Sequence, residues 1–262
     1  MKVAIVQFKT EKSKQRNIQK AIGFIQKAAD KKVKLILFPE TFLSYVKTSE
    51  DIGKQAEVLT GPTTRLFAQK AKEYKIAILL GSVYEEKKGQ KKVYNTSVLL
   101  DNRGRYVARY RKVHLFSACI DGKKIDEHKN ILPGIFLATG KIEQFKFGFS
   151  VCYDLRFADM YGKYRKKGVN VFFVPSAFTR KTGKVHWETL LKARAIENCA
   201  YVLAPNQVGI NGKGVALYGN SMAISPSGKI LKRGSSHREE VLYVDLSLKE
   251  LKKAKKVLPD FV

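Results

Sequence analysis

Short apolar runs bounded by turn residues alternate with stretches of helical periodicity along the whole chain, and this alternation constrains the fold more than any other feature. Alternating or β-branched apolar runs are typical of strands, whereas apolar residues spaced three and four apart are typical of amphipathic helices. The pattern predicts strands over residues 2–8, 35–38, 76–84, 94–100, 106–112, 146–151, 169–174, 201–204, 221–225, 230–233 and 239–244. It predicts helices over residues 17–29, 63–74, 158–167, 186–198 and 248–256.

Two turn sequences indicate that hairpins are mixed with crossover connections. A turn at residues 101–104 ends in Gly104, and another at residues 225–228 ends in Gly228, each between two predicted strands. Two sheets of this composition would each need one face packed on the other and one face covered by helices. The expected fold is therefore α/β, a four-layer α-β-β-α sandwich.

The chain has 262 residues, of which 44% are hydrophobic and 11% aromatic. This length lies within the range of one α/β domain, and the apolar share suffices to bury a substantial core. The sequence contains no repeat, no low-complexity tract and no linker rich in proline, glycine or serine. We therefore expect a single domain over residues 1–262.

Neither a membrane span nor a signal peptide is indicated. No apolar run approaches the roughly 18 residues of a spanning helix, and the amino terminus lacks a long apolar stretch with a cleavage site. Cys119, Cys152 and Cys199 are too scattered for a disulfide framework, and no cysteine or histidine spacing indicates a metal site. We expect a cytoplasmic protein with reduced thiols, without a metal and without a membrane partner.

Basic residues strongly outnumber acidic ones. The chain contains 50 lysines and arginines and 23 aspartates and glutamates, for a formal net charge of +27. Such a field draws anions toward any cleft and favours acidic ligands. A basic polyanion-binding protein is the alternative, but the lysines are spread along the chain without an RNA-binding signature or a zinc finger. We expect a solvated basic surface and no specific nucleic-acid partner.

Three polar or reactive side chains, Glu40, Lys112 and Cys152, lie where an apolar strand ends abruptly. Strand ends beside loops are common positions for catalytic groups, because a rigid sheet fixes them. Taken singly, each residue has an ordinary explanation: a surface carboxylate, a solvated lysine and an inert buried thiol.

Together these residues and the sequence Cys-Tyr-Asp-Leu-Arg-Phe at 152–157 resemble the nitrilase, or carbon–nitrogen hydrolase, superfamily over nearly the whole chain. The resemblance implies the α-β-β-α fold and a Glu-Lys-Cys triad, with Glu40 as the base, Lys112 as an oxyanion donor and Cys152 as the nucleophile. The implied reaction cleaves a carbon–nitrogen bond through a thioester and releases ammonia, without a metal or an organic cofactor.

The family pattern also contains a second carboxylate, six residues before a Pro-Gly pair. Glu127 stands six residues before Pro133 and is assigned this catalytic role by the resemblance, with a solvated loop glutamate as the alternative. The preceding residues 117–126, which include Cys119, depart from the family's usual sequence. The wall of the pocket, and with it the substrate, is therefore not defined by the resemblance.

Segments after Cys152 resemble the Nit branch of amidases, whose members hydrolyse small α-keto acid amides. The similarity lies in residues 175–179, 182–183, 186–188 and 194–198. It implies substrate contacts at Tyr153, Arg156, Phe178 and Thr179, and a guanidinium can hold a carboxylate bidentately. A structural ion pair is the alternative for Arg156.

The favoured interpretation is a deaminated glutathione amidase, because residues 176–198 resemble that group more closely than the ω-amidases. An ω-amidase acting on 2-oxoglutaramate, an N-carbamoyl hydrolase and a nitrilase are the alternatives. Asn220 and Ser227 replace a histidine and a tryptophan that are frequent in this branch, so the specificity could differ. The resemblance also implies a homodimer or higher homo-oligomer, and the expected partner is a small anionic amide substrate.

Overall fold

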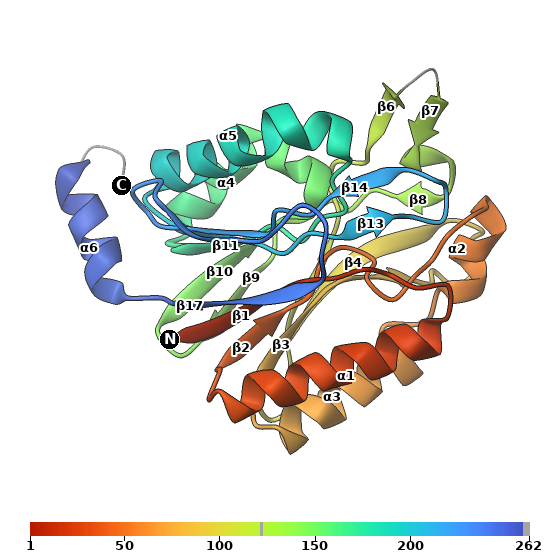
Figure 1. Ribbon diagram of the computed structural model, residues 1–262, viewed down its shortest axis with the longest axis horizontal. Helices are drawn as coiled ribbons and strands as arrows, with labels where there is room; N and C mark the ends of the chain where they lie inside the picture. The colour runs from red at the N-terminus through yellow and green to blue at the C-terminus, as the bar shows by residue number, and fades with distance from the viewer. Residues whose placement is uncertain (121–122, 259–262) are drawn as a thin grey trace.

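Two β-sheets packed face to face form the centre of the molecule, in a computed structural model that describes residues 1–120 and 123–258 (Figure 1). The first sheet has the order β17-β1-β2-β3-β4-β5, with β8 paired to β4; its strands are β1 (Lys2–Gln7), β2 (Leu35–Leu37), β3 (Ala77–Glu85), β4 (Val93–Leu100), β5 (Tyr106–Arg111), β8 (Ile131–Leu132) and β17 (Glu240–Asp245). The second has the order β16-β15-β12-β11-β10-β9; its strands are β9 (Thr139–Ile142), β10 (Phe145–Phe149), β11 (Val171–Phe173), β12 (Tyr201–Ala204), β15 (Met222–Ile224) and β16 (Ile230–Arg233).

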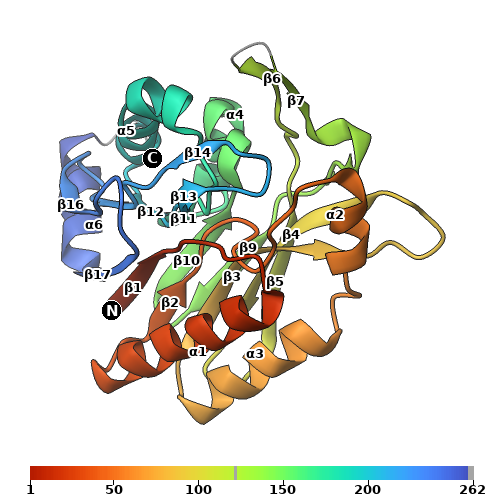
Figure 2. The same ribbon diagram turned by 45° about the vertical axis from the view of Figure 1, so that its right-hand side comes forward.

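Helices cover the outer face of each sheet (Figure 1, Figure 2). Helices α1 (Lys14–Asp30) and α3 (Pro62–Glu73) lie against the first sheet, and α4 (Ala158–Lys166) and α5 (Arg180–Asn198) against the second. Two other helices, α2 (Ser49–Gln55) and α6 (Leu248–Val257), lie toward opposite ends of the molecule. The four-layer α-β-β-α sandwich predicted from the sequence is therefore confirmed.

Strand β1 shows how alternation in the sequence builds these layers. Its side chains point to opposite faces in turn. Val3 and Ile5 belong to the core between the two sheets, whereas Ala4 and Val6 pack with the buried face of α1. All four are fully buried, so burial on both faces of the sheet explains the continuous apolar run.

Both predicted hairpins are present, since β4 pairs antiparallel with β5 and β15 with β16. Helix α5, however, begins at Arg180, six residues before the predicted start at residue 186. Thr179 caps it by accepting a hydrogen bond from the Thr182 backbone N–H. Its first turns contain lysine, threonine and glycine rather than spaced apolar residues, so periodicity could not mark them.

Besides the hairpin of β9 with β10, two further hairpins were not predicted: β6 (Ser117–Ile120) with β7 (Lys123–Asp126), and β13 (Val208–Ile210) with β14 (Ala216–Tyr218). The first falls in the stretch of residues 117–126, of which residues 121–122 lie outside the described part of the chain. Both project from the sheets near the same end of the sandwich (Figure 2). Their short strands carry little apolar alternation, which explains why they escaped the sequence pattern.

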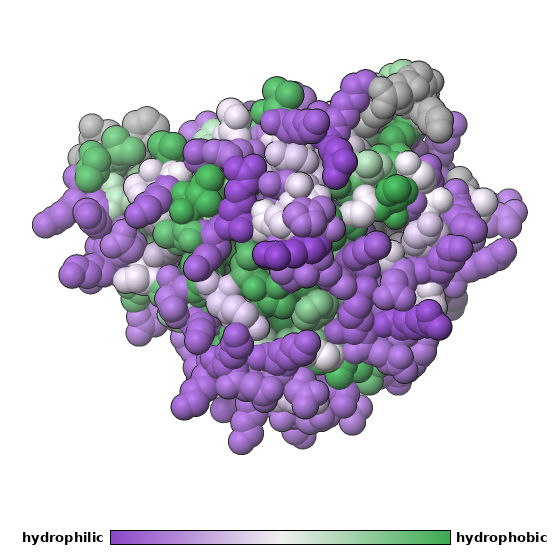
Figure 3. Space-filling view, in the orientation of Figure 1, coloured by the Kyte–Doolittle hydropathy of each residue, from purple (hydrophilic) through white to green (hydrophobic). Residues whose placement is uncertain are grey.

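Hydrophilic side chains cover most of the face shown in Figure 3, and apolar side chains appear there in smaller separate areas. Within residues 1–120 and 123–258, no helix has both the length and the apolar character needed to cross a membrane.

Candidate active site

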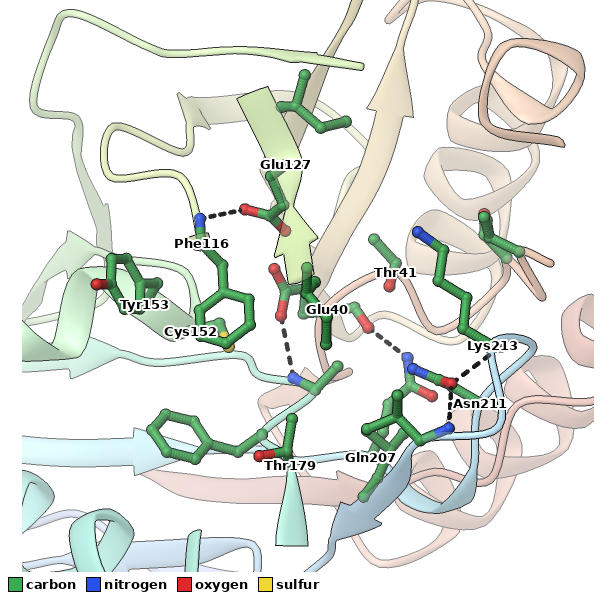
Figure 4. Close-up of a pocket in the computed structure, with 18 of the residues that line it drawn as sticks. Glu40, Thr41, Phe116, Glu127, Cys152, Tyr153, Thr179, Gln207, Asn211 and Lys213 are labelled. Carbon is green, nitrogen blue, oxygen red and sulfur yellow. Dashed lines mark hydrogen bonds between the residues drawn. The ribbon is translucent and has the colours of Figure 1, made fainter. Parts of the chain in front are cut away.

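A pocket near the ends of strands β2, β5 and β10 contains Glu40, Lys112, Glu127 and Cys152 (Figure 4). The residues come from both sheets, so the sandwich itself brings together side chains that are far apart in sequence. The segment after β2 passes very close to β3 at Gly81, where an added Cβ would lie 1.9 Å from the Phe38 carbonyl oxygen. Only glycine permits this approach, which helps to position Glu40.

Glu40 is only 4% exposed, and both oxygens of its carboxylate are hydrogen-bonded. Oε1 accepts from Lys112 Nζ at 2.9 Å and from Asn95 Nδ2 at 2.9 Å, while Oε2 accepts from the Ala177 backbone N–H at 3.0 Å. Gln207 Nε2 donates to the Glu40 carbonyl oxygen at 2.7 Å. Asn95 and Gln207 were not predicted as site residues, although they determine where Glu40 lies.

Lys112 lies between two carboxylates and is 1% exposed. Its Nζ is 2.9 Å from Glu40 Oε1 and 2.9 Å from Glu127 Oε2. Burial by itself lowers the pKa of Lys112, but the adjacent Glu127 and Glu40 carboxylates outweigh burial and hold that pKa well above its usual value. The ammonium is therefore permanently charged, and its Nζ also donates to Glu127 Oε1 at 3.1 Å.

Glu127 begins a short 3-10 helix, η1 (Glu127–Lys129), and is held in place by Phe116. The Phe116 N–H donates to Glu127 Oε2 at 2.7 Å, and the Glu127 N–H donates to the Phe116 carbonyl at 2.9 Å. Burial raises the pKa of Glu127, Lys112 lowers it, and the like charge of Glu40 raises it, with a net increase. Glu127 therefore holds a proton more readily than an ordinary glutamate does.

Cys152 begins a second 3-10 helix, η2 (Cys152–Arg156), with a positive φ of 50°. A non-glycine residue in this left-handed region is strained, and such strain concentrates at functional sites. The Cys152 N–H donates to the Pro175 carbonyl at 2.9 Å, and the thiol lies in the same pocket as the Glu40 carboxylate. Burial and the negative charge of Glu40 raise the pKa of Cys152 well above its usual value, so the resting residue is a thiol beside a base.

All four predicted substrate contacts, Tyr153, Arg156, Phe178 and Thr179, line the pocket. The Arg156 guanidinium carbon lies 5.6 Å from the Tyr153 ring centre and 5.3 Å from the Phe178 ring centre, and Nη1 donates to His186 Nδ1 at 3.2 Å. Arg156 makes no ion pair with any of the described carboxylates. The interpretation of Arg156 as part of a structural ion pair is therefore not supported.

Tyr84 is a further pocket residue that the sequence did not single out. Burial raises the pKa of Tyr84, and the negative charges of Glu127 and Glu40 raise it further, so its hydroxyl stays protonated. The site thus combines a thiol, two carboxylates, a buried ammonium and a neutral hydroxyl. Within the described residues, no group of three or more histidine, cysteine, aspartate or glutamate side chains could hold a metal ion.

Comparison with known proteins decides the family. Residues 2–256 match the model of the family described as carbon–nitrogen hydrolase. The chain belongs to this family. It is 31% identical to the ω-amidase NIT2 of Homo sapiens over 261 residues, which cover 99% of this chain and 93% of the relative. It is 34% identical to the deaminated glutathione amidase of Dictyostelium discoideum over 268 residues, with coverage of 99% and 92%.

A solved structure supports the same conclusion for this carbon–nitrogen hydrolase. The crystal structure of Saccharomyces cerevisiae Nit3, a member of branch 10 of the nitrilase superfamily, superimposes with a TM-score of 0.89 at 30% identity. The match covers 99% of this chain and 94% of the yeast chain. The family and the fold expected from the sequence motifs are therefore confirmed.

Proposed function

We propose that this carbon–nitrogen hydrolase cleaves a small, carboxylate-bearing amide through a thioester on Cys152. The observation that carries the proposal is that the Cys152 thiol shares one pocket with Glu40, Lys112 and Glu127. A thiol needs a base to become a nucleophile, and a developing oxyanion needs fixed donors. Each requirement is met by a side chain within this group.

In the first half of the reaction, Glu40 takes the thiol proton as Cys152 Sγ attacks the amide carbon. The carbonyl oxygen becomes an oxyanion held by Lys112 Nζ and by the backbone N–H of Tyr153, which follows the nucleophile in the η2 turn. Glu40 then returns the proton to the nitrogen, the carbon–nitrogen bond breaks and an amine leaves. Such donors are each typically worth about 3 to 4 kcal/mol in the transition state.

In the second half, a water molecule attacks the thioester. Glu40 or Glu127 removes its proton, the carbon–sulfur bond breaks, and the sulfur regains a proton as the carboxylic acid leaves. The steps balance without a metal or an organic cofactor. The leaving group is ammonia, as expected from the sequence, only when the amide is primary; an N-substituted amide releases an amine instead.

Deaminated glutathione is the first candidate substrate, supported by the 34% identity to the Dictyostelium amidase and by the resemblance of residues 176–198. 2-Oxoglutaramate is the second, supported equally by the similarity to NIT2. Arg156 would hold the carboxylate of either compound, with Tyr153, Phe178 and Thr179 around it. N-carbamoyl amino acids and nitriles are the alternative substrates, and the test must distinguish their hydrolysis from that of an amide.

The decisive experiment offers deaminated glutathione, 2-oxoglutaramate, an N-carbamoyl amino acid and a nitrile to the purified chain. Release of 2-oxoglutarate, ammonia and carbon dioxide is measured for each compound. Cys152→Ala is expected to abolish turnover, whereas Cys119→Ala, which alters an exposed thiol, retains it. Turnover that persists in Cys152→Ala contradicts the mechanism. If none of the four compounds is turned over and the chain binds polyanions with a steep salt dependence, the polyanion-binding alternative is favoured.

Three further expectations belong to this proposal. We propose a single functional domain over residues 1–262, of which residues 121–122 and 259–262 lie outside the described chain. We also propose a homodimer or higher homo-oligomer, supported by Ile135 and Phe136, adjacent side chains that are 78% and 77% exposed. Light scattering during size-exclusion chromatography tests this oligomeric state.

A cytoplasmic location stays a prediction. It is tested by locating the tagged chain in its own cell.

A further inference from the structure

Lys213 lines the same pocket from the loop between β13 and β14. Figure 4 shows its side chain extending toward Thr41, and it shows Lys213 and Tyr153 on opposite sides of Cys152 and Glu40. The Lys213 ammonium makes neither an ion pair nor a hydrogen bond with any of the described residues. It is thus an uncompensated positive charge at one end of the pocket.

Among the described cations that line the pocket, Arg156 is the other one without a carboxylate partner. Lys112 also lines it, but its charge is matched by Glu40 and Glu127 at 2.9 Å. Arg156 contacts His186 and two aromatic rings rather than a carboxylate. Because Arg156 lies beside Tyr153, the two uncompensated cations are on opposite sides of the nucleophile.

The loop that carries Lys213 contains its own hydrogen bonds. Asn211 Oδ1 accepts from the backbone N–H groups of Lys213 and Val215, each at 3.0 Å. The neighbouring Gly212 lies very close to the segment that follows β2, so a Cβ added to it would be 2.2 Å from the Val46 carbonyl oxygen. The loop therefore packs directly against this segment, and only glycine permits the approach.

The same hairpin is connected to the proposed base. Gln207, which directly precedes β13, donates from Nε2 to the Glu40 carbonyl and accepts from Thr10 Oγ1 at 2.7 Å. The position of Lys213 is therefore set relative to Glu40 through one short hairpin.

We propose that Lys213 binds a second anionic group of the substrate, on the opposite side of the scissile bond from the carboxylate bound by Arg156. The inference rests on the proposed amidase function and assigns a specificity-determining residue to it. The anionic group bound by Lys213 is a carboxylate on the leaving amine of an N-substituted amide, the kind of amide to which deaminated glutathione, the first candidate substrate, belongs. A primary amide with a single carboxylate fills only the Arg156 end.

The test compares two substrates that differ only in the distal charge. One is the amide of the 2-oxoglutarate side-chain carboxyl with alanyl-glycine, and the other is the same compound with the glycine carboxylate replaced by a carboxamide. The ratio of their kcat/KM values is measured for each variant. Because both values come from one protein preparation, any loss of folded enzyme cancels in the ratio.

The wild-type chain is expected to prefer the carboxylate by about fivefold, the factor that an exposed ion pair can supply. Lys213→Met is expected to bring the ratio close to one, Lys213→Glu to reverse it, and Lys213→Arg to retain most of it. Lys88→Met removes an exposed charge from the β3–β4 connection and is the matched control, with a ratio equal to wild type. Added salt lowers only those ratios that depend on Lys213.

Two results would overturn the inference in distinguishable ways. If the chain hydrolyses both compounds and Lys213→Met has the wild-type ratio, the role of Lys213 is wrong while the amidase function stands. If the wild-type chain hydrolyses neither compound nor any other amide of the panel, the proposed function fails and this inference fails with it.

Discussion

Asp154 Oδ1 lies 2.7 Å from His114 Nδ1, and this contact joins the loop after β5 to the turn that carries Cys152. The same oxygen accepts from the His114 N–H at 2.9 Å, while Oδ2 accepts from the Tyr110 hydroxyl and the Val151 N–H, each at 2.8 Å. Asp154 is fully buried, so a single carboxylate connects the ends of strands from the two sheets.

Asp154→Asn should lower the free energy of unfolding by about 3 kcal/mol, because an amide nitrogen would face donors where a carboxylate oxygen now accepts. The turnover number should also fall about tenfold or more, since Cys152 loses its fixed position. Urea unfolding and steady-state kinetics measure the two effects. Asp245→Asn changes an exposed aspartate of β17 and serves as the control. Equal stabilities of the two variants would contradict this role for Asp154.

Lys112→Met should destabilise the fold by about 3 to 5 kcal/mol, because removing one partner leaves Glu40 and Glu127 buried without a counter-charge. Lys112 is among the influences that lower the pKa of Glu127, so its loss lets this carboxyl bind a proton at higher pH. The difference from wild type should consequently shrink as the pH falls from 8 to 5. Denaturant unfolding across this pH range measures the difference in unfolding free energy, with Lys88→Met as the control variant. A pH-independent difference would show that charge is not the cause.

Much of the site could be predicted because its signals are local in sequence. Glu40, Lys112 and Cys152 each follow an apolar strand, and resemblance to one family supplied the roles that spacing alone could not. The structure brings Glu40 and Lys112 to 2.9 Å although 72 positions separate them. This proximity requires β2 and β5 to join the same sheet. The predicted strands do not give that arrangement until the fold is known.

Residues that hold the site by distant contacts could not be predicted. Asn95 is 55 positions from Glu40, and Gln207 is 167 positions away; neither lies in a motif. Lys213 is one lysine among many in a highly basic chain, in a hairpin whose short strands have little periodicity. Their roles depend on which loops meet at the end of the sandwich, and a single sequence does not encode this locally.

The raised pKa of Cys152 predicts a specific dependence of stability on pH. The folded chain retains the thiol proton above pH 9, where the unfolded chain has released it, because burial and Glu40 disfavour the thiolate. The folded state then binds more protons, so the stability that is fully present below the unfolded pKa is lost as the pH rises. Urea unfolding between pH 8 and 10 should therefore show a steeper decline for wild type than for Cys152→Ser, by up to about 1.4 kcal/mol per pH unit. Parallel curves would contradict the buried thiol.

Arg156→Lys should raise KM for 2-oxoglutaramate about tenfold with a smaller change in kcat, because a planar guanidinium can bind a carboxylate through two parallel hydrogen bonds and an ammonium cannot. The guanidinium also lies near the Tyr153 and Phe178 rings, a position that lysine would not reproduce. Steady-state kinetics measure both constants, and Arg103→Lys, at an exposed turn position, serves as the matched control. A fall in kcat at unchanged KM would instead place Arg156 in the chemical step. With KM and kcat both unchanged, the substrate carboxylate would have to be bound elsewhere, and Lys213 would be the next residue to replace.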